Sequence, residues 1–313
     1  MPSTSRLSEW LRERLPPPHA SGLPVRRLTP VSGGCIHATW RLDLEAGTRV
    51  FLKSTHRSAL PMLQAEADGL RALADVAARG SRLSMPALPE PLALGELDGQ
   101  ALLVLSWLDL CGRADQGAWR SLGSALACLH QMSRGMNGGR GYGFPTDNFI
   151  GSTPQSNGWL ADWGRFFCDR RLRPQLDLLR RRGREPQGSA ALLERVTDWL
   201  ADHNPEPVLV HGDLWSGNAG LLRNGGGALF DPAVYWADRE VDLAMARLFG
   251  GFPPAFFEGY ATTWPLPAAA TGRVELYNLY HLLNHATLFD GGKAGGYQSQ
   301  AAAVIGRLLR QRG

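Results

Sequence analysis

The residue types best suited to catalysis cluster between positions 211 and 231. Asp213 is followed five positions later by Asn218, and Asp231 comes after the next predicted hairpin. Phosphoryl transfer requires a carboxylate beside the acceptor hydroxyl and oxygen ligands for magnesium, and an Asp, an Asn and an Asp in this order can supply them. Asp and Asn are also common turn residues, so a single pair would mean little. The complete set indicates a phosphotransferase.

A candidate nucleotide-binding group lies far upstream. Lys53 ends a predicted strand, and Glu66 follows on a predicted helix. A lysine can contact the α- and β-phosphates of ATP when a glutamate on the neighbouring helix holds it in place. The alternative is an accidental surface pair. However, only two of the 33 lysines and arginines are lysines, Lys53 and Lys293, which favours a role for Lys53 that arginine cannot fill.

A glycine pair precedes the first of the predicted strands. Gly33 and Gly34 would let backbone amides approach phosphates, although Gly-Gly is equally common in ordinary turns. The P-loop pattern G-x-x-x-x-G-K-[ST] is missing from the sequence, since Lys293 follows glycines but precedes Ala294. The sequence therefore argues against a P-loop NTPase.

The elements that must position these residues fall into two parts. Up to Ser106 the pattern predicts mainly strands, at 40–44, at 50–52 and in a hairpin over 92–105. One helix over 63–74 lies between them, and a short helix over 6–15 precedes them and ends before three prolines.

Beyond Ser106 the periodicity is helical, and a short β insert over 208–231 interrupts it. Helices are predicted near 119–129, 160–182, 189–202, 239–249 and 272–288. The layout is that of an α+β protein: a small antiparallel-sheet lobe with one helix, then a larger, mainly helical lobe. We expect the boundary near Ser106–Asp109.

Several strings of the sequence resemble the fructosamine kinase, or ketosamine-3-kinase, family. The two most specific are HGDLWSGN (211–218) and DNFIGSTPQSN (147–157). The others, which extend the resemblance over nearly the full chain, are FDPAVYWADREVDLAM (230–245), WGRFFCDRRLRPQL (163–176), YHLLNHATLF (280–289), SGGCIHATWRL (32–42), FLKS (51–54) and LQAEADGL (63–70). HGD with a distant Asn would fit aminoglycoside or choline kinases equally well, but the two specific strings together favour the narrower family.

This resemblance implies a two-lobed protein-kinase-like fold. Residues 1–105 would form the nucleotide-binding lobe, and residues 106–313 the catalytic and substrate lobe. The implied activity is ATP-dependent phosphorylation of the sugar O3 of a ketosamine (a fructosamine or ribulosamine), free or protein-bound. The unstable 3-phosphate would then let the amine be recovered, which is a role in protein deglycation.

The resemblance also implies roles for individual residues. Asp213 is the proton acceptor, and Asn218 and Asp231 hold magnesium. Lys53 contacts the phosphates of ATP, and Glu66 positions it. The backbone of Ser106, Trp107 and Leu108 would form the hinge that meets adenine.

The sequence departs from the protein-kinase pattern after Asp231, and it leaves other acceptor substrates open. Asp231-Pro232-Ala233 replaces the D-F-G of protein kinases and no A-P-E segment follows, so a regulated activation loop is not expected. The same fold could instead serve an aminoglycoside, choline-like or other small hydroxyl acceptor. Trp215 either walls a sugar pocket or packs as an ordinary aromatic, and Asp242 is expected to brace or cap the catalytic loop.

Composition sets the expected partners and compartment. The formal net charge is +4, and the basic run from Arg170 to Arg184 carries leucines at helical spacing, so we interpret it as a solvated helix face. A non-catalytic nucleotide- or nucleic-acid-binding protein is the less favoured alternative, and nucleic acid is not an expected partner.

Four cysteines without a C-x-x-C pair fit a reducing compartment, with Cys35 the thiol to test for a redox role. Without a signal peptide or a long apolar run, we expect a cytoplasmic protein without membrane contact. The sequence does not set the oligomeric state.

Overall fold

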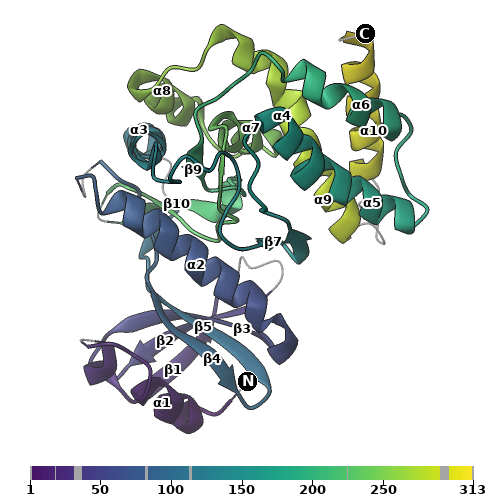
Figure 1. Cartoon of the computed structure of the whole chain (residues 1–313). Coiled ribbons are helices and arrows are strands. Elements are labelled where there is room, and N and C mark those ends of the chain that lie inside the picture. Colours follow the sequence, from purple (N-terminus) through teal and green to yellow (C-terminus); the bar gives the residue numbers. More distant parts are fainter. Residues whose placement is uncertain are drawn as a thin grey trace.

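The computed structural model describes residues 2–17, 19–31, 37–81, 84–112, 115–223, 225–289 and 296–311. Gly33, Gly34, Cys35 and Lys293 lie outside these ranges. The described chain forms a sheet-containing lobe and a larger helical lobe, and helix α2 runs between them (Figure 1). None of the helices in the described ranges is long and apolar enough to cross a membrane.

The small lobe is built on a five-stranded antiparallel sheet with the order β1-β2-β3-β5-β4. Its strands are β1 (Val25–Pro30), β2 (Ala38–Leu44), β3 (Arg49–His56), β4 (Pro91–Leu97) and β5 (Gln100–Ser106). Its helical elements are α1 (Thr4–Arg12), η1 (His19–Gly22), η2 (Arg57–Ala59) and α2 (Leu60–Ala77).

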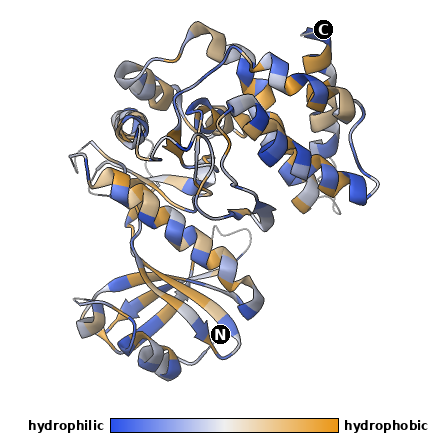
Figure 2. Ribbon diagram, viewed as in Figure 1, coloured by the Kyte–Doolittle hydropathy of each residue, from blue (hydrophilic) through white to orange (hydrophobic). Residues whose placement is uncertain are grey.

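Alternation along the strands explains why this sheet has a helix on each face. On β5, Leu102 and Val104 join the hydrophobic cluster that contains α1. Their neighbours Ala101, Leu103 and Leu105 join the cluster formed with α2. Because side chains alternate between faces, every second residue of a strand shares a face. The lobe therefore has two packed helices, both near the positions predicted from the sequence, 6–15 and 63–74, and Figure 2 shows hydrophobic and hydrophilic residues on both.

The hairpin between β4 and β5 turns at the predicted dipeptide. Asp98 and Gly99 both have positive φ angles, 49° and 76°. A two-residue hairpin loop of this kind matches the twist of the flanking strands, and it needs residues that tolerate the left-handed region. The Asp-Gly pair thus sets the register of β4 against β5.

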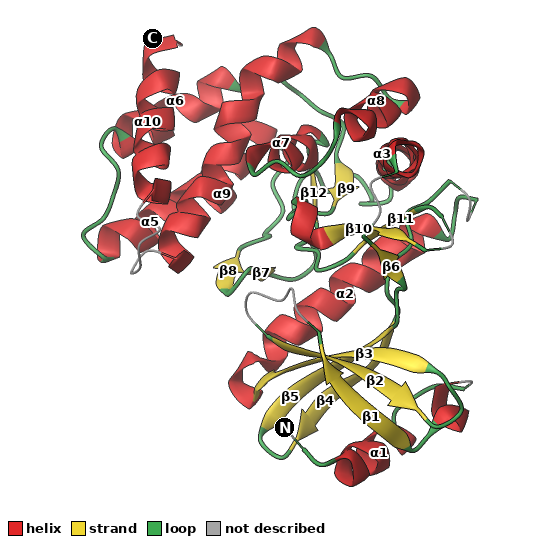
Figure 3. Ribbon diagram, turned by 180° about the vertical axis from the view of Figure 1, so that it is seen from behind, coloured by secondary structure: helices red, strands yellow, loops and turns green. Residues whose placement is uncertain are grey.

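The larger lobe is mainly helical, and its last helices lie farthest from the sheet (Figure 1, Figure 3). Its helices are α3 (Gln116–Ser133), α4 (Trp163–Phe166), α5 (Arg173–Arg181), α6 (Ser189–Trp199), α7 (Glu240–Leu248), α8 (Pro254–Thr263), α9 (Val274–Phe289) and α10 (Gly296–Gln311). Short helical turns are η3 (Phe167–Leu172), η4 (Ser216–Asn218) and η5 (Ala268–Arg273). The turn η3 is π-helical and joins α4 to α5.

Short strands in this lobe flank and connect residues 211–231, the candidate catalytic segment. They are β6 (Leu110–Cys111), β7 (Asn148–Ile150), β8 (Thr153–Gln155), β9 (Val208–Val210), β10 (Ala219–Leu222), β11 (Gly227–Leu229) and β12 (Tyr235–Ala237). β11, β10 and β6 form one sheet, β12 pairs with β9, and β7 pairs with β8. β9 is buried at all three positions, so the residues that follow it start from a fixed point in the core.

The α+β, two-lobed prediction is confirmed, and most predicted helices and strands are present. The structure adds elements that the pattern did not predict, chiefly α8, α10 and the β7–β8 hairpin. It also corrects the interpretation of the basic run: Arg171 is completely buried, whereas Arg173 and Arg180 are exposed and paired with acids.

Candidate active site

A cavity of about 550 Å³ lies between the small-lobe sheet and the catalytic segment. All the described residues expected to be catalytic, nucleotide-binding or metal-binding border it. They are Lys53, Glu66, Ser106, Trp107, Leu108, Asp213, Asn218 and Asp231. The structure thus brings together residues that are up to 178 positions apart in the sequence.

Lys53 is buried and forms ion pairs with two carboxylates. Its position on β3 places it on the same face as α2, and its Nζ lies 2.8 Å and 2.9 Å from the two carboxylate oxygens of Glu66. On the other side Nζ donates to Asp231 Oδ1 at 2.5 Å. Burial alone would lower the pKa of Lys53, but Asp231 and Glu66 outweigh it and raise that pKa. The site therefore holds a permanent ammonium group that joins the two lobes.

Asp213 follows β9 and faces the cavity with one strong side-chain partner. Asn218 Nδ2 donates to the carboxylate Oδ2 of Asp213 at 3.1 Å and to its backbone oxygen at 2.9 Å. Burial, together with the nearby charge of Asp231, raises the pKa of Asp213 to about 7. A carboxylate with this pKa is suited to accept a proton near neutral pH.

The backbone that presents Asp213 is held from behind by Asp242 on α7. Asp242 accepts hydrogen bonds from the backbone N–H groups of His211, at 2.7 Å, and Gly212, at 2.8 Å. Burial would raise the pKa of Asp242, but the hydrogen bond from His130 and the N–H donors keep that pKa below its usual value. The expectation that Asp242 braces this loop is confirmed.

Gly212 is required at its position for two reasons. Its φ is +80°, and a Cβ added there would lie 2.1 Å from the backbone oxygen of Ala233. The close approach is reinforced by a hydrogen bond from the Ala233 N–H to the His211 oxygen, at 2.8 Å. The catalytic loop and the segment after Asp231 therefore touch along their backbones, which explains the glycine of the HGD string.

Asn218 and Asp231 both border the cavity, and both carry side-chain oxygen atoms of a kind suited to a divalent cation. Asn218 Nδ2 lies 3.4 Å from the backbone oxygen of Asp231, so the two residues are neighbours. Among the hydrogen bonds between described residues, none uses Asn218 Oδ1 or Asp231 Oδ2. An amide oxygen and a carboxylate oxygen are ligands that magnesium prefers, so these residues fit such an ion.

The proposed hinge forms one wall of the cavity. The N–H of Ser106 donates to Glu90 O at 2.9 Å, which anchors the end of β5. The Trp107 ring lies 6.4 Å from the Phe51 ring. On the opposite wall, the ring of Trp215 lies so close to Gly217 that an added Cβ would be 2.2 Å from it. Trp215 thus borders the cavity with its ring held against the catalytic loop.

The β7–β8 hairpin also lines the cavity, and single residues of the sequence did not predict this contribution. Asn148, Phe149 and Gly151 all line the cavity. Their string, DNFIGSTPQSN, was used only as a marker of family resemblance. Its density of amide side chains was the available signal, because amides buried together must form hydrogen bonds with one another or with the backbone.

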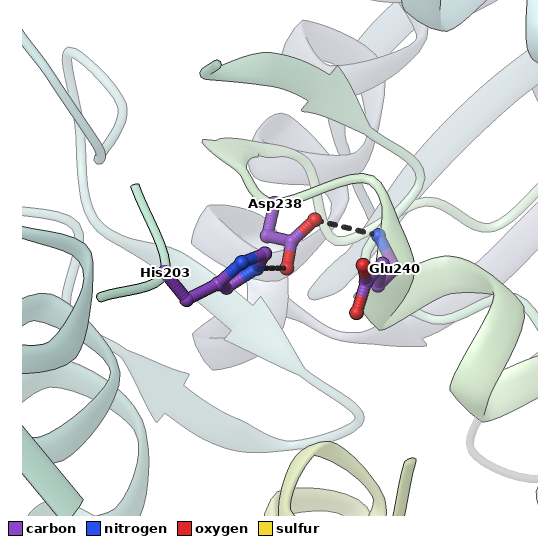
Figure 4. A group of neighbouring side chains, drawn as sticks. All are labelled: His203, Asp238 and Glu240. Atoms are coloured by element: carbon purple, nitrogen blue, oxygen red, sulfur yellow. Dashed lines mark hydrogen bonds and ion pairs between the residues drawn. The ribbon is translucent and has the colours of Figure 1, made fainter. Parts of the chain in front are cut away.

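A second polar cluster, remote from this cavity, resembles a metal site at first sight. His203, Asp238 and Glu240 place their ligand atoms within 4.8 Å of one another (Figure 4). However, Arg273 binds both carboxylate oxygens of Glu240, at 2.7 Å and 2.8 Å. His203 and Tyr277 both engage Asp238 Oδ2. The cluster is therefore a satisfied hydrogen-bonded network that ties α7 to α9.

Solved structures share this architecture over the whole chain. A crystal structure of a candidate fructosamine-3-kinase from Haemophilus somnus 129PT superposes with a TM-score of 0.83, at 28% identity and 97% coverage of both chains. An aminoglycoside phosphotransferase in a ternary complex with ADP and hygromycin B gives a TM-score of 0.61, at 18% identity, and covers 96% of this chain and 97% of that one. That likeness shows the fold alone. Fold and site together define a phosphotransferase with a protein-kinase-like architecture.

The sequence comparisons are more specific. A model of the fructosamine kinase family matches residues 14–311. A probable ketoamine kinase from Synechocystis sp. is 43% identical over 286 residues, 91% of both chains. The chloroplastic protein-ribulosamine 3-kinase of Arabidopsis thaliana is 35% identical over 91% of this chain and 83% of that protein. The chain belongs to the fructosamine kinase family, and it is a kinase.

Proposed function

We propose that this protein transfers the γ-phosphoryl group of ATP to the O3 hydroxyl of a ketosamine, a fructosamine or ribulosamine that is free or attached to a protein. The observation that carries the proposal is the convergence of an ammonium, its orienting carboxylate, a carboxylate base and two oxygen ligands on one cavity. The names of the relatives, ketoamine kinase and protein-ribulosamine 3-kinase, support this acceptor class.

In the proposed reaction Asp213 accepts the proton of the attacking hydroxyl. The hydroxyl oxygen forms a bond to the γ-phosphorus while the bond from that phosphorus to the bridging oxygen of ADP breaks. The hydrogen bond from Asn218 fixes the Asp213 carboxylate during this step. Trp215 would form an apolar wall for the sugar, which excludes water from the acceptor.

Asn218 and Asp231 would hold magnesium, because their free oxygens fit it. When bound, the ion supplies positive charge that neutralises the phosphoryl oxygens. Lys53 would contact the phosphates, with Glu66 fixing the ammonium from the α2 side. The backbone at Trp107 and Leu108 would receive adenine, and Gly33 and Gly34 would approach the phosphates. We place the two functional lobes at residues 1–105 and 106–313.

The proposed biological role is protein deglycation in the cytoplasm. Phosphorylation at O3 replaces hydroxide by phosphate as the leaving group at C3, so the 3-phosphate is unstable. Loss of phosphate, followed by hydrolysis of the bond between the remaining sugar and nitrogen, would release the amine. The basic run from Arg170 to Arg184 matches no nucleic-acid-binding motif, so we propose no nucleic-acid partner. The proposed acceptor is a small ketosamine or a glycated protein chain.

A substrate panel tests this proposal. Purified protein is incubated with ATP and magnesium and, in turn, with fructoselysine, ribuloselysine, an aminoglycoside and choline, while ADP formation is measured. We expect ADP only with the ketosamines, a 3-phosphate in the product by ³¹P NMR, and loss of turnover on addition of a chelator that excess magnesium reverses. Turnover with the aminoglycoside or choline alone would assign a different acceptor to the same site.

A further inference from the structure

Arg171 is a fully buried cation without a carboxylate partner. Its side chain is 0% exposed, and none of the ion pairs between described residues includes it. Its partners are neutral oxygens: Nη2 donates to Asn157 Oδ1 at 2.7 Å, and Nη1 donates to Ser156 O at 2.6 Å. Its Cζ also lies 3.8 Å from the ring centroid of Tyr235. A buried charge is costly unless it is compensated, so this arrangement calls for an explanation beyond packing.

The oxygens that bind Arg171 begin a chain of buried hydrogen bonds. Asn157 Nδ2 and Gln155 Nε2 both donate to Asn148 Oδ1, at 2.8 Å and 2.7 Å. Asn148 Nδ2 in turn donates to the backbone oxygen of Val234 at 2.8 Å, and Gln155 Nε2 also reaches the backbone oxygen of Ala233 at 3.2 Å. The chain therefore ends on the backbone oxygens of Ala233 and Val234, two and three residues after Asp231.

That backbone needs to be held in place. Asp231 has a φ of +57°, in the left-handed region that side chains other than glycine rarely adopt. Such a residue keeps its conformation only when its surroundings over-determine it, and this is common at catalytic sites. The direction of the Asp231 carboxylate depends on this backbone conformation, and it is this carboxylate that forms the ion pair with Lys53 at the cavity.

The local helix geometry delivers Arg171 to this position. The chain from Trp163 to Arg181 is helical throughout, but its middle turn, η3, is π-helical. A π-turn accommodates an extra residue and changes the direction in which neighbouring side chains project, and such turns occur frequently at functional sites. Arg173, only two residues away, projects to the surface and pairs with Asp169.

We propose that Arg171 is a positioning residue which, through two buried asparagines, fixes the backbone conformation of Asp231. Arg171 does not border the cavity, so it acts through the hydrogen-bond chain and not on a substrate. The inference rests on the metal-binding role proposed for Asp231 and extends it to a residue outside the site. It also assigns a function to the β7–β8 hairpin, which carries Asn148.

The test measures metal affinity separately from turnover. Wild type, Arg171→Met, Arg171→Lys and the surface control Arg173→Met are titrated with Mn²⁺ in the presence of AMP-PNP by isothermal titration calorimetry. Nucleotide affinity without metal, kcat, the KM for the acceptor and the thermal unfolding midpoint are measured on the same samples. We expect Mn²⁺ affinity and kcat to fall about 10- to 100-fold in Arg171→Met, the range for residues that orient metal ligands, with metal-free nucleotide affinity and acceptor KM unchanged.

The variants separate positioning from folding. Arg171→Lys keeps the charge but cannot make both bonds of the guanidinium fork, so it should show a smaller loss of the same kind. If Arg171→Met does not fold, Asn148→Ser, which cuts the chain nearer to Asp231, replaces it with the same expected loss. Unchanged Mn²⁺ affinity in a folded variant, or an equal loss in Arg173→Met, would overturn the proposal. If wild type itself binds no Mn²⁺ with nucleotide, the proposed metal role of Asp231 fails instead.

Discussion

Two buried cations, Lys53 and Arg171, have their charges compensated differently. Lys53, in the small lobe, lies between the carboxylates of Glu66 and Asp231. Arg171, in the helical lobe, is surrounded by amide and carbonyl oxygens and by the ring of Tyr235. Lys53 borders the cavity, whereas Arg171 does not.

The difference fits the roles that we propose for the two cations. A cation that meets a ligand needs partners that the ligand can replace, and Asp231 is such a partner because 40% of its side chain remains exposed. A cation that holds the backbone needs partners that never leave. Neutral oxygens with fixed geometry serve this purpose, and a planar guanidinium with five donors can bind several of them at once.

The largest expected effect comes from removing the proposed base, Asp213. Asp213→Asn should lower kcat by about 10²- to 10⁴-fold, the range for general acid–base catalysis, with little change in nucleotide affinity. Steady-state kinetics with a ketosamine acceptor measure this. The control is Asp198→Asn, at an exposed position on α6. Full turnover in Asp213→Asn would mean that another group accepts the proton.

The next largest effect is expected when the ammonium of Lys53 is replaced by a guanidinium, the kind of cation found at Arg171. Lys53→Arg keeps the charge but replaces a compact ammonium by a planar fork in a buried space between two carboxylates. We expect kcat/KM for ATP to fall on the order of 10- to 100-fold, which corresponds to one charge-assisted hydrogen bond. The other lysine supplies the control, since Lys293→Arg should leave kcat/KM intact. Equal activity of the two variants would remove the phosphate role of Lys53.

A smaller loss of stability and activity is expected from a change at Asp242, which binds the backbone of the catalytic loop. Asp242→Asn retains one acceptor oxygen but loses the second, so one of the N–H groups of His211 and Gly212 is left without a partner. The free energy of unfolding should fall by about 1.5–3 kcal/mol, as for other hydrogen bonds to charged groups, and kcat/KM for ATP should fall less than in Lys53→Arg. Chemical denaturation and steady-state kinetics measure the two effects. A drop in kcat without any loss of stability would point to direct contact with substrate.

The smallest effect is expected at an exposed ion pair. Arg120 and Glu258 join α3 to α8, but their side chains are 52% and 56% exposed. Water screens such pairs, so Arg120→Ala should change the free energy of unfolding by at most about 1 kcal/mol and leave turnover unchanged. Thermal unfolding and an activity assay check this. A larger loss would show that ion pairs on the surface of this protein matter as much as the buried ones.

Sequence patterns predicted the parts of the site that depend on local structure. Strand alternation places Lys53 on the α2 face of β3, and helical spacing places Glu66 opposite it. The HGDLWSGN string is local as well, because a buried strand leads directly into the turn at Gly212. Short-range periodicity was sufficient for these residues, and it was also sufficient for the two-lobed fold.

The position of Arg171 could not be predicted in this way. It lies in a run of arginines with leucines at helical spacing, which is typical of a solvated face. Its burial depends on a π-turn, which periodicity does not reveal, and on contacts with residues 148–157 that form only in the folded chain. The β7 and β8 strands, with three residues each, are too short to give a recognisable pattern.

The ion pair between Lys53 and Asp231 has a consequence for how a nucleotide would bind. The ammonium loses most of its water when the protein folds, because the two carboxylates substitute for it. A phosphate that arrives would exchange with one carboxylate and would not have to dehydrate a free cation. The cost of removing water from the ammonium is thus met when the protein folds and not when the nucleotide binds. If the phosphate replaces Asp231 at Lys53, the Asp231 carboxylate becomes available to a metal ion as the phosphate enters.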